Sequence, residues 1–398
     1  MSNSASDIPS SSSAENQKPM SPLSGVKVVD MSRILAGPWA GQVLADLGAT
    51  VLKIERPKVG DDTRHWGPPY LKDGDGNDTK DAAYFFSANR GKQSVCIDIT
   101  QPEGQAQIRE LIASADVVIE NYKVGGLAKY GLDYESLKEA NPALVYCSIT
   151  GFGQTGPYAQ RAGYDFMIQA MGGLMSITGE PDSAGGQPTK VGVAVTDIFT
   201  GLYSVIGIQA ALHERQRTGL GKHVDMALFD CSAAILANQA SNYLIGGVVP
   251  GRMGNAHPNI VPYQVFASAD GHLIIAVGND GQFANLCKVL DLPELAEHAN
   301  SKTNAARVGN REVLCALLQV ELAKRTTVEW LEALEAVNVP CGPINTVDQV
   351  FNDPQILARD MVQTVNHPVG GEIKLAASPI RFVGEAKAEV CAPPVLSE

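Results

Sequence analysis

The first half of the chain alternates between short apolar runs and longer segments of helical character. Residues 26–31 and 50–55 are β-branched runs of strand length, and the segment between them is expected to form a helix up to about residue 47. Pro38 suits the first turn of that helix, and Gly48 suits its end. These segments predict a strand–helix–strand unit at the start of the ordered chain.

The alternation continues beyond this first unit. Strand-like runs occupy residues 94–99, 116–120 and 144–149, and helical segments occupy residues 102–113 and 134–140. Alternation at this pace predicts an α/β fold with a doubly wound, mostly parallel sheet that has helices on both faces. The sheet is Rossmann-like, but no GxGxxG follows its first strand. Ligands of such a sheet bind at the carboxyl ends of the strands.

The pattern changes further along the chain. Helices are expected at residues 191–212 and 230–244, with a short strand at 222–227 between them. Two apolar runs, at residues 261–266 and 271–277, then flank an Asp-Gly pair that signals a hairpin. Two more helical segments follow, at residues 310–324 and 328–337. This part of the chain is therefore expected to form a smaller α+β domain.

Composition excludes several classes of function. Of the 398 residues, 44% are hydrophobic and 19% are charged, as in an ordinary globular enzyme. The formal net charge of -12 argues against general nucleic-acid binding, so no nucleic-acid partner is expected. We also expect no membrane partner, because no apolar run reaches the length of a membrane span.

The cysteines and the N-terminus indicate the compartment. The chain has seven cysteines, an odd number without a CxxC pair, which predicts reduced thiols in a reducing environment. Residues 1–22 are rich in serine and carry acids but no apolar block, so a disordered tail is expected there. This stretch lacks the features of a secretory signal or a transit peptide, and we expect a cytoplasmic protein.

Positive and amide side chains recur next to the predicted strands. Arg56 follows the second strand, and Asn89 and Arg90 precede the third. Asn121 and Tyr122 follow the next strand, with Lys129 soon after them. Each cation alone could be a solvated surface group. Their repetition in an acidic protein predicts a polyphosphate ligand held by side chains, with Tyr122 either packed on a purine or placed in the core.

One carboxylate stands between a glycine-rich turn and an apolar segment. Asp165 follows the turn at residues 151–157 and precedes residues 166–175, which are expected to form a buried helix. Free N–H groups and the helix dipole stabilise an anion at such a position. Asp165 is therefore either an N-cap or a carboxylate nucleophile that faces a cleft. No histidine pair has metal-ligand spacing and HExxH is absent, so we predict no metal.

A series of short motifs extends over residues 23–394. In chain order they are LAGP at 35–38, IERP at 54–57, GDDTR at 60–64, WGPP at 66–69, NR at 89–90, ENY at 120–122, GFGQTGP at 151–157, GYD at 163–165, TDI at 196–198 and GPI at 342–344. These motifs resemble the class III CoA-transferases, also called the CaiB/BaiF or formyl-CoA transferase-like family. Further stretches are similar to the branch of the family that uses succinyl-CoA and glutarate, namely residues 161–165, 242–246, 260–264 and 287–294.

The resemblance implies a fold and an assembly. Family members form an interlocked homodimer in which each chain threads through a hole in the other. Applied to this sequence, the family pattern places a large CoA-binding α/β domain at residues 23–225 and 341–398. Residues 226–340 would then form a linker helix and the small α+β domain.

The resemblance also implies a mechanism. The family's aspartate, matched by Asp165, attacks the acyl-CoA carbonyl to form a mixed anhydride, and the released thiolate converts the anhydride into an aspartyl-CoA thioester. The acceptor acid then attacks in its turn. Coenzyme A is a substrate in this scheme, with no permanently bound cofactor. The CoA-binding residues expected from the motifs and the basic pattern are Arg56, Asn89, Arg90, Asn121, Tyr122 and Lys129.

The expected partners are an acyl-CoA donor and a carboxylic acid acceptor, with succinyl-CoA and a dicarboxylate such as glutarate as the implied pair. The second carboxylate of a diacid needs a cationic or N–H partner in a dry cleft. The candidate substrate-binding residues are Arg33, Leu35, Arg252, Gly254, Asn255 and His257. The loop at residues 251–258 has only two glycines where formyl-CoA transferase has a glycine run, which leaves the oxyanion-binding groups open.

Two alternatives compete with CoA transfer. An α-methylacyl-CoA racemase of the same superfamily needs a base on each side of the α-carbon and has a histidine immediately before the matched aspartate. Here Asp197 is present at the second base position, but Tyr164 replaces the histidine. The second alternative is a CoA-binding or redox protein without transferase chemistry. An Asp165→Asn variant would separate it from a transferase, because binding should survive while turnover is lost. A transferase of the same class with another pair of acids also stays open.

Overall fold

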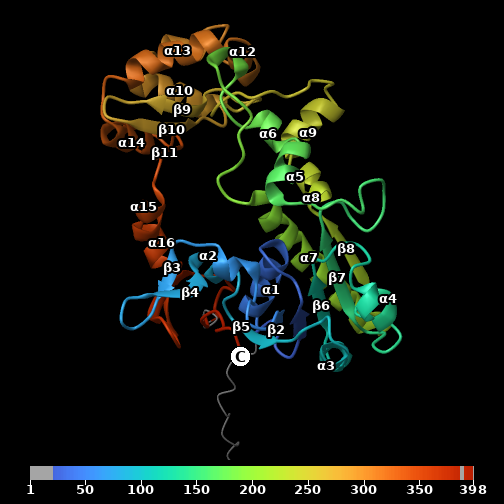
Figure 1. Cartoon of the computed structure of the whole chain (residues 1–398). Helices are drawn as coiled ribbons and strands as arrows, with labels where there is room; N and C mark the ends of the chain where they lie inside the picture. The colour runs from blue at the N-terminus through green and yellow to red at the C-terminus, as the bar shows by residue number, and fades with distance from the viewer. Residues whose placement is uncertain (1–20, 386–389, 398) are drawn as a thin grey trace, which may run out of the picture.

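The computed structural model describes residues 21–385 and 390–397. The predicted tail at residues 1–22 therefore lies, except for its last two residues, outside the described part. The described chain forms two lobes that are connected by two separate segments of chain, one entering and one leaving the smaller lobe (Figure 1).

A six-stranded parallel sheet forms the centre of the larger lobe. Its strands are β1 (Lys27–Asp30), β2 (Thr50–Glu55), β5 (Lys92–Cys96), β6 (Val117–Glu120), β7 (Val145–Thr150) and β8 (His223–Ala227). They lie in the order β5-β2-β1-β6-β7-β8, and every neighbouring pair is parallel. The strand order reverses between β1 and β6, as in a Rossmann-like sheet. The predicted doubly wound parallel sheet is confirmed, with β5 starting two residues earlier than expected.

Two hydrophobic layers cover the faces of this sheet. Helices α1 (Ala36–Asp46) and α7 (Val195–Thr218) pack on one face, where Val28 and Cys147 point. Helices α3 (Pro102–Ala113) and α4 (Tyr134–Leu137) cover the other face, to which the neighbouring residues Val29 and Tyr146 contribute. Successive side chains of a strand point to opposite faces, so each strand feeds both layers.

Helix α7 is long and apolar enough, by length and composition alone, to cross a membrane. Its buried face includes Val205, Ile208, Ala211 and Leu212, which pack in the layer shared with α1. The core helix of a globular protein can have the same length and composition, and the expectation of no membrane partner stays a prediction.

The smaller lobe has its own sheet and core. Strands β9 (Tyr263–Ala267), β10 (His272–Ala276) and β11 (Cys341–Pro343) form an antiparallel sheet in the order β11-β10-β9. The helices around it are α10 (Asp280–Val289), α11 (Glu294–Glu297), α12 (Asn304–Gly309), α13 (Arg311–Leu322) and α14 (Thr327–Glu335). Phe283, Leu318 and Trp330 are buried in their common core. The expected α+β unit and its hairpin are confirmed, whereas α10, α11 and α12 were not predicted.

Two segments that the sequence predicted as single helices are each divided into two helices in the structure. The expected helix at residues 230–244 is two helices, α8 (Leu228–Ala234) and α9 (Ala237–Leu244), because the backbone at Ala237 is left-handed with φ of 46°. The expected helix at residues 166–175 divides likewise into α5 (Asp165–Met171) and α6 (Leu174–Ile177), because Gly173 has φ of 88°.

The C-terminal segment returns to the larger lobe. It contains α15 (Val347–Asn352), α16 (Pro354–Ala358) and the hairpin of β12 (Val362–His367) and β13 (Gly371–Ala376). The carbonyl of Cys391 accepts a hydrogen bond from the Gly91 N–H, and Arg64 donates to the carbonyl of Pro394. The remaining elements of this lobe are β3 (Tyr70–Lys72), β4 (Asp78–Ala82), α2 (Ala83–Phe86), η1 (Asp62–His65) and η2 (Ala128–Tyr130), and η3 (Asp182–Ala184) lies in the segment between α6 and α7. The domain boundaries themselves stay a prediction.

Candidate active site

A cavity of about 780 Å³ opens at the carboxyl ends of the parallel strands. Its wall includes residues that follow β1, β2, β6 and β7, together with the first residues of α5 and α7. The position agrees with the rule that ligands of such a sheet bind outside the carboxyl ends, near the point where the strand order reverses. The predicted site residues on this wall are Arg33, Leu35, Arg56, Asn121, Tyr122, Lys129 and Asp165.

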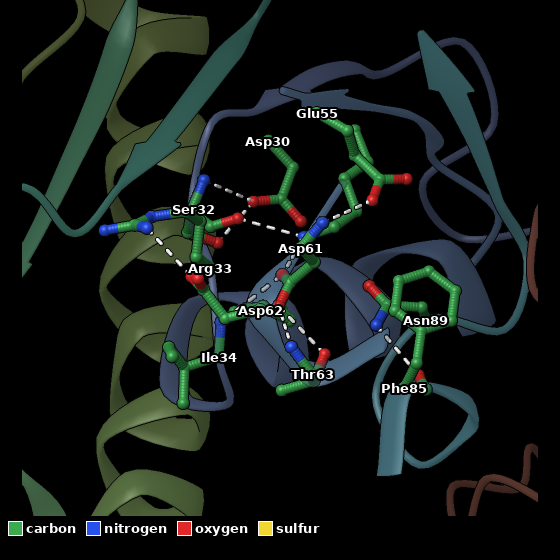
Figure 2. A network of polar contacts seen from close by, with 12 residues as sticks. Asp30, Ser32, Arg33, Ile34, Glu55, Asp61, Asp62, Thr63, Phe85 and Asn89 are labelled. Atoms are coloured by element: carbon green, nitrogen blue, oxygen red, sulfur yellow. Dashed lines mark hydrogen bonds and ion pairs between the residues drawn. The ribbon is translucent and has the colours of Figure 1, made fainter. Parts of the chain in front are cut away.

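The loop after β1 replaces a glycine-rich nucleotide loop. Arg33 and Asn121 exchange two hydrogen bonds across the reversal point: the Arg33 N–H donates to Asn121 Oδ1 at 2.9 Å, and Asn121 Nδ2 donates to the Arg33 carbonyl at 2.7 Å. Ile34 has φ of 73°, which is rare for a β-branched residue and costs backbone strain. The loop is therefore held in one conformation by its neighbours, as Figure 2 shows for the contacts around Ile34.

Two arginines on the wall share one carboxylate. Arg33 Nη1 lies 2.8 Å from Asp62 Oδ2, and Arg56 Nη2 lies 2.7 Å from Asp62 Oδ1. Both guanidinium groups remain partly exposed to the cavity, and Arg33 lies over the Tyr122 ring at 5.7 Å. Lys129 lines the same side, with Nζ 4.6 Å from the neighbouring tyrosine ring. This side of the cavity is suited to phosphate groups.

A buried ion pair supports the loop that follows β1. Lys53 Nζ lies 2.8 Å from Asp61 Oδ2 and donates to the Ser32 carbonyl at 2.9 Å. The Asp61 carboxylate also accepts the N–H groups of Ile34 and Thr63. Burial alone would raise the pKa of Asp61, but Lys53 and the bonds from Thr63 outweigh it and lower the pKa to about 2. The charged Asp61 carboxylate therefore holds the strained backbone at Ile34 in place.

The segment that carries Asp165 comes close to the end of β7 through two glycines. A Cβ atom on Gly151 would lie 2.5 Å from the Gly163 Cα, and one on Gly163 would lie 2.3 Å from the Gly151 Cα. Any side chain at either position would push the two backbones apart. The glycines therefore set the depth at which Asp165, the first residue of α5, meets the cavity.

The Asp165 carboxylate is held on both oxygens. Thr196 donates to Oδ1 through its N–H at 2.9 Å and its hydroxyl at 2.5 Å, and the Asp197 N–H lies 3.4 Å from the same atom. Gln169 Nε2 donates to Oδ2 at 2.7 Å. Thr196 and Gln169 are fully buried, so the carboxylate cannot rotate freely while it faces the cavity. A fixed, hydrogen-bonded carboxylate in a cleft is suited to act as a nucleophile.

Comparison with known proteins identifies the family. The sequence matches the model of CoA-transferase family III over residues 23–398. The chain belongs to CoA-transferase family III. This result confirms the resemblance found in the motifs and identifies the protein as a CoA-transferase.

Relatives of this family III transferase agree with the assignment. A succinate-glutarate CoA-transferase from Agrobacterium fabrum is 53% identical over 390 residues, which cover 95% of this chain and 96% of that protein. Human succinyl-CoA:glutarate CoA-transferase is 45% identical over 377 residues, with 95% of this chain and 84% of the human protein covered. The crystal structure of a CAIB/BAIF family protein from Brucella suis is similar with a TM-score of 0.81 and 55% identity, covering 94% of this chain and 96% of that chain.

Two residues predicted to bind CoA lie away from the cavity of the transferase. Asn89 is fully buried, donates to the Phe85 carbonyl and accepts from Lys92 Nζ. Arg90 pairs with Asp46 at 2.5 Å. Both residues precede a strand, and in a parallel sheet that position lies at the edge opposite the carboxyl ends. Their placement gives them a structural role, so we leave them out of the proposed site.

The loop at residues 251–258 also lies outside the cavity wall. Arg252 pairs with Asp182 and donates to the Glu180 carbonyl, and the Gly254 N–H donates to the Gly179 carbonyl. Asn255 is exposed, and the His257 ring contacts Tyr263 with centroids 5.2 Å apart. None of the predicted residues Arg252, Gly254, Asn255 and His257 therefore lines the cavity that holds Asp165.

Several residues of the wall were not among the predicted ones. Asp62, Lys123 and Arg161 line the cavity, and Gln169 and Thr196 hold the nucleophile candidate. Gln169 was accessible to sequence reasoning, because it lies four residues after Asp165 on the same helix face. In the described residues no group of three or more His, Cys, Asp or Glu side chains could hold a metal ion. The absence of a metal and of a permanent cofactor stays a prediction.

Proposed function

We propose that this transferase moves CoA from succinyl-CoA to glutarate or a closely related dicarboxylate, with Asp165 as the nucleophile. The observation that carries the proposal is the fixed Asp165 carboxylate at the wall of a cavity whose other side is cationic. Two relatives that are 53% and 45% identical are named as CoA-transferases of succinate and glutarate, which supports this acid pair.

The proposed reaction has two halves. An oxygen of Asp165 attacks the thioester carbonyl, the carbon–sulfur bond breaks, and the CoA thiolate leaves a mixed anhydride behind. The thiolate then attacks the Asp165 carbonyl, which releases succinate and leaves an aspartyl-CoA thioester. The acceptor carboxylate attacks that thioester, and the same two steps run in reverse to give the new acyl-CoA. Covalent catalysis of this kind divides one difficult step into easier ones.

We place the nucleotide end of CoA at the cationic side of the cavity, beside Arg56 and Lys129. Arg56→Ala and Lys129→Ala are then expected to raise KM for the acyl-CoA with little change in kcat, because both charges act equally on bound substrate and transition state. Each contact is partly exposed and is worth up to about 1 kcal/mol, or roughly a fivefold rise in KM. Steady-state kinetics with Lys138→Ala as the matched control, an exposed lysine outside the cavity, would check this. An unchanged KM in both variants would contradict the placement.

We propose that a guanidinium group binds the free carboxylate of the acceptor. Transfer to glutarate, succinate and adipate should then exceed transfer to butyrate and formate, because the monoacids have no second carboxylate for the guanidinium group to bind. Arg33→Ala is expected to reduce this preference, since Arg33 lines the cavity. Arg252→Ala tests the second candidate arginine, which is paired with Asp182 and lies outside the cavity wall. Equal rates with butyrate and glutarate in the wild type would argue against glutarate and leave a transferase with another acid pair.

We also propose a homodimer. Large apolar side chains are exposed around the nucleophile and on the segment leading to the small lobe, where Tyr164 is 68%, Leu244 77% and Ile245 87% exposed. Such a concentration of apolar surface is typical of an interface. Light scattering in solution is expected to give twice the 42.1 kDa of one chain, and a mass of one chain at micromolar concentration would rule the dimer out.

A further inference from the structure

Asp197 is a second carboxyl group on the wall of the cavity, beside Asp165. It is the third residue of α7, and the residue before it is the buried Thr196 that binds Asp165. Its N–H lies 3.4 Å from Asp165 Oδ1. Within residues 21–385 and 390–397, the oxygens of Asp197 accept no hydrogen bond and form no ion pair. The carboxyl group therefore faces the cavity without a protein partner.

The two carboxyl groups cannot easily be charged together. Burial, and then the charge of Asp165, raise the pKa of Asp197 to about 7. Another titratable group near them is Tyr84 of α2, whose pKa is raised by burial and by Asp197, Asp165 and Asp61. In the described part of the chain Asp197 forms no ion pair, so a second negative charge at this point would be uncompensated. Asp197 therefore holds a proton below about pH 7, and the four donors around Asp165 stabilise a carboxylate there.

We infer that Asp197 transfers a proton to and from the CoA sulfur in each half of the reaction. This inference rests on the covalent mechanism proposed above. When the Asp165 oxygen bonds to the acyl carbon, the negative charge passes to the departing sulfur. The Asp197 O–H then gives its proton to that sulfur, and the thiol and the Asp197 carboxylate are formed together.

Acylation itself prepares Asp197 for this step. As an anhydride Asp165 is neutral, so the smaller of the two causes that raise the pKa of Asp197 disappears at the moment when the thiolate needs a proton, and only burial still opposes its charge. The return step reverses it: the Asp197 carboxylate takes the proton from the thiol, and the thiolate attacks the Asp165 carbonyl carbon. No proton is consumed, and the pair of carboxyl groups never carries two negative charges.

The pH dependence of transfer tests this role. Because the protonated form of Asp197 is the active one, kcat/KM for the acyl-CoA in the wild type is expected to be level below about pH 7 and to fall above it. Asp197→Asn is neutral at every pH, so this decrease should be absent and the rate at pH 6 should be reduced about 10²-fold, the lower end for general acid–base catalysis. Asp230→Asn is the matched control, an exposed aspartate at the same position of α8.

Further measurements separate this role from other causes. Hydroxylamine should still convert the activated Asp165 carbonyl into a hydroxamate in the Asp197→Asn protein, only more slowly, and no adduct in the wild type would mean that the proposed function has failed instead. The variant should also melt at a higher temperature than the wild type at pH 8, where the wild type carries a buried charge. A wild-type profile that is level from pH 6 to pH 8.5, or a variant with unchanged rate and pH profile, would overturn the inference.

Discussion

Replacing Asp165 by alanine is expected to abolish CoA transfer and to leave the fold and CoA binding in place. The variant loses the only atom that we propose to carry the acyl group, so the rate should fall by about 10⁴-fold or more, as for other nucleophiles that act within a unit. Two buried groups, Thr196 and Gln169, also lose their acceptor, which costs roughly 1–3 kcal/mol of folding free energy for each group left unpaired.

Two assays and two companion variants make this expectation specific. Asp165→Asn keeps an oxygen for the hydrogen bond from Thr196 and should be as inactive as Asp165→Ala but more stable. Asp230→Ala, at an exposed position, should retain full activity. Mass spectrometry after treatment with acyl-CoA and hydroxylamine should find a modified peptide that contains Asp165 only in the wild type. Transfer by the alanine variant at more than a few per cent of the wild-type rate would refute the assignment.

Local pattern was sufficient for elements whose limits are marked by glycine or proline. The strand Thr50–Glu55 and the helix Pro102–Ala113 have the predicted bounds. The strand of residues 92–96 was placed two residues too late, because Lys92 looks like a surface residue in the sequence. In the fold its Nζ is buried between Asp30 and Asn89, partners that lie 62 and 3 residues away. A charged residue in a core is recognised only once its partners are known.

Site residues could be predicted where they directly follow a strand, but not where segments that are far apart in the sequence come together. Arg56 and Asn121 follow strands, and the parallel sheet brings them to one edge. Asn89 and Arg90 were assigned to the same edge although they precede a strand, and the direction of the strands places them at the other one. The bonds from Thr196 to Asp165 join residues 31 positions apart, and nothing in the local sequence indicates such a contact.

The largest effect on stability is expected from Asp61→Asn. Asparagine retains an oxygen for the N–H of Thr63, so the change removes the charge opposite Lys53 and little else. Lys53 is then left fully buried with the Ser32 carbonyl as its remaining close partner. Breaking one side of a buried ion pair typically costs about 3–5 kcal/mol. Because Lys53 also donates to the Ser32 carbonyl in this loop, the loss of its ion pair should loosen the loop on the cavity wall and raise KM for the acyl-CoA.

The pH dependence of unfolding identifies the cause of that loss. The pKa of Asp61 is lowered to about 2 in the folded protein, so its charge stabilises the fold above the unfolded pKa of about 4 and this stabilisation disappears as the pH falls through 2. The shift corresponds to about 2 kcal/mol. Urea unfolding should therefore show the wild type losing its advantage over Asp61→Asn as the pH is lowered from 7 toward 3. Asp75→Asn, at an exposed loop, should match the wild type throughout. A free energy of unfolding within 0.5 kcal/mol of the wild type at pH 7 would show that the Lys53–Asp61 pair does not hold this loop.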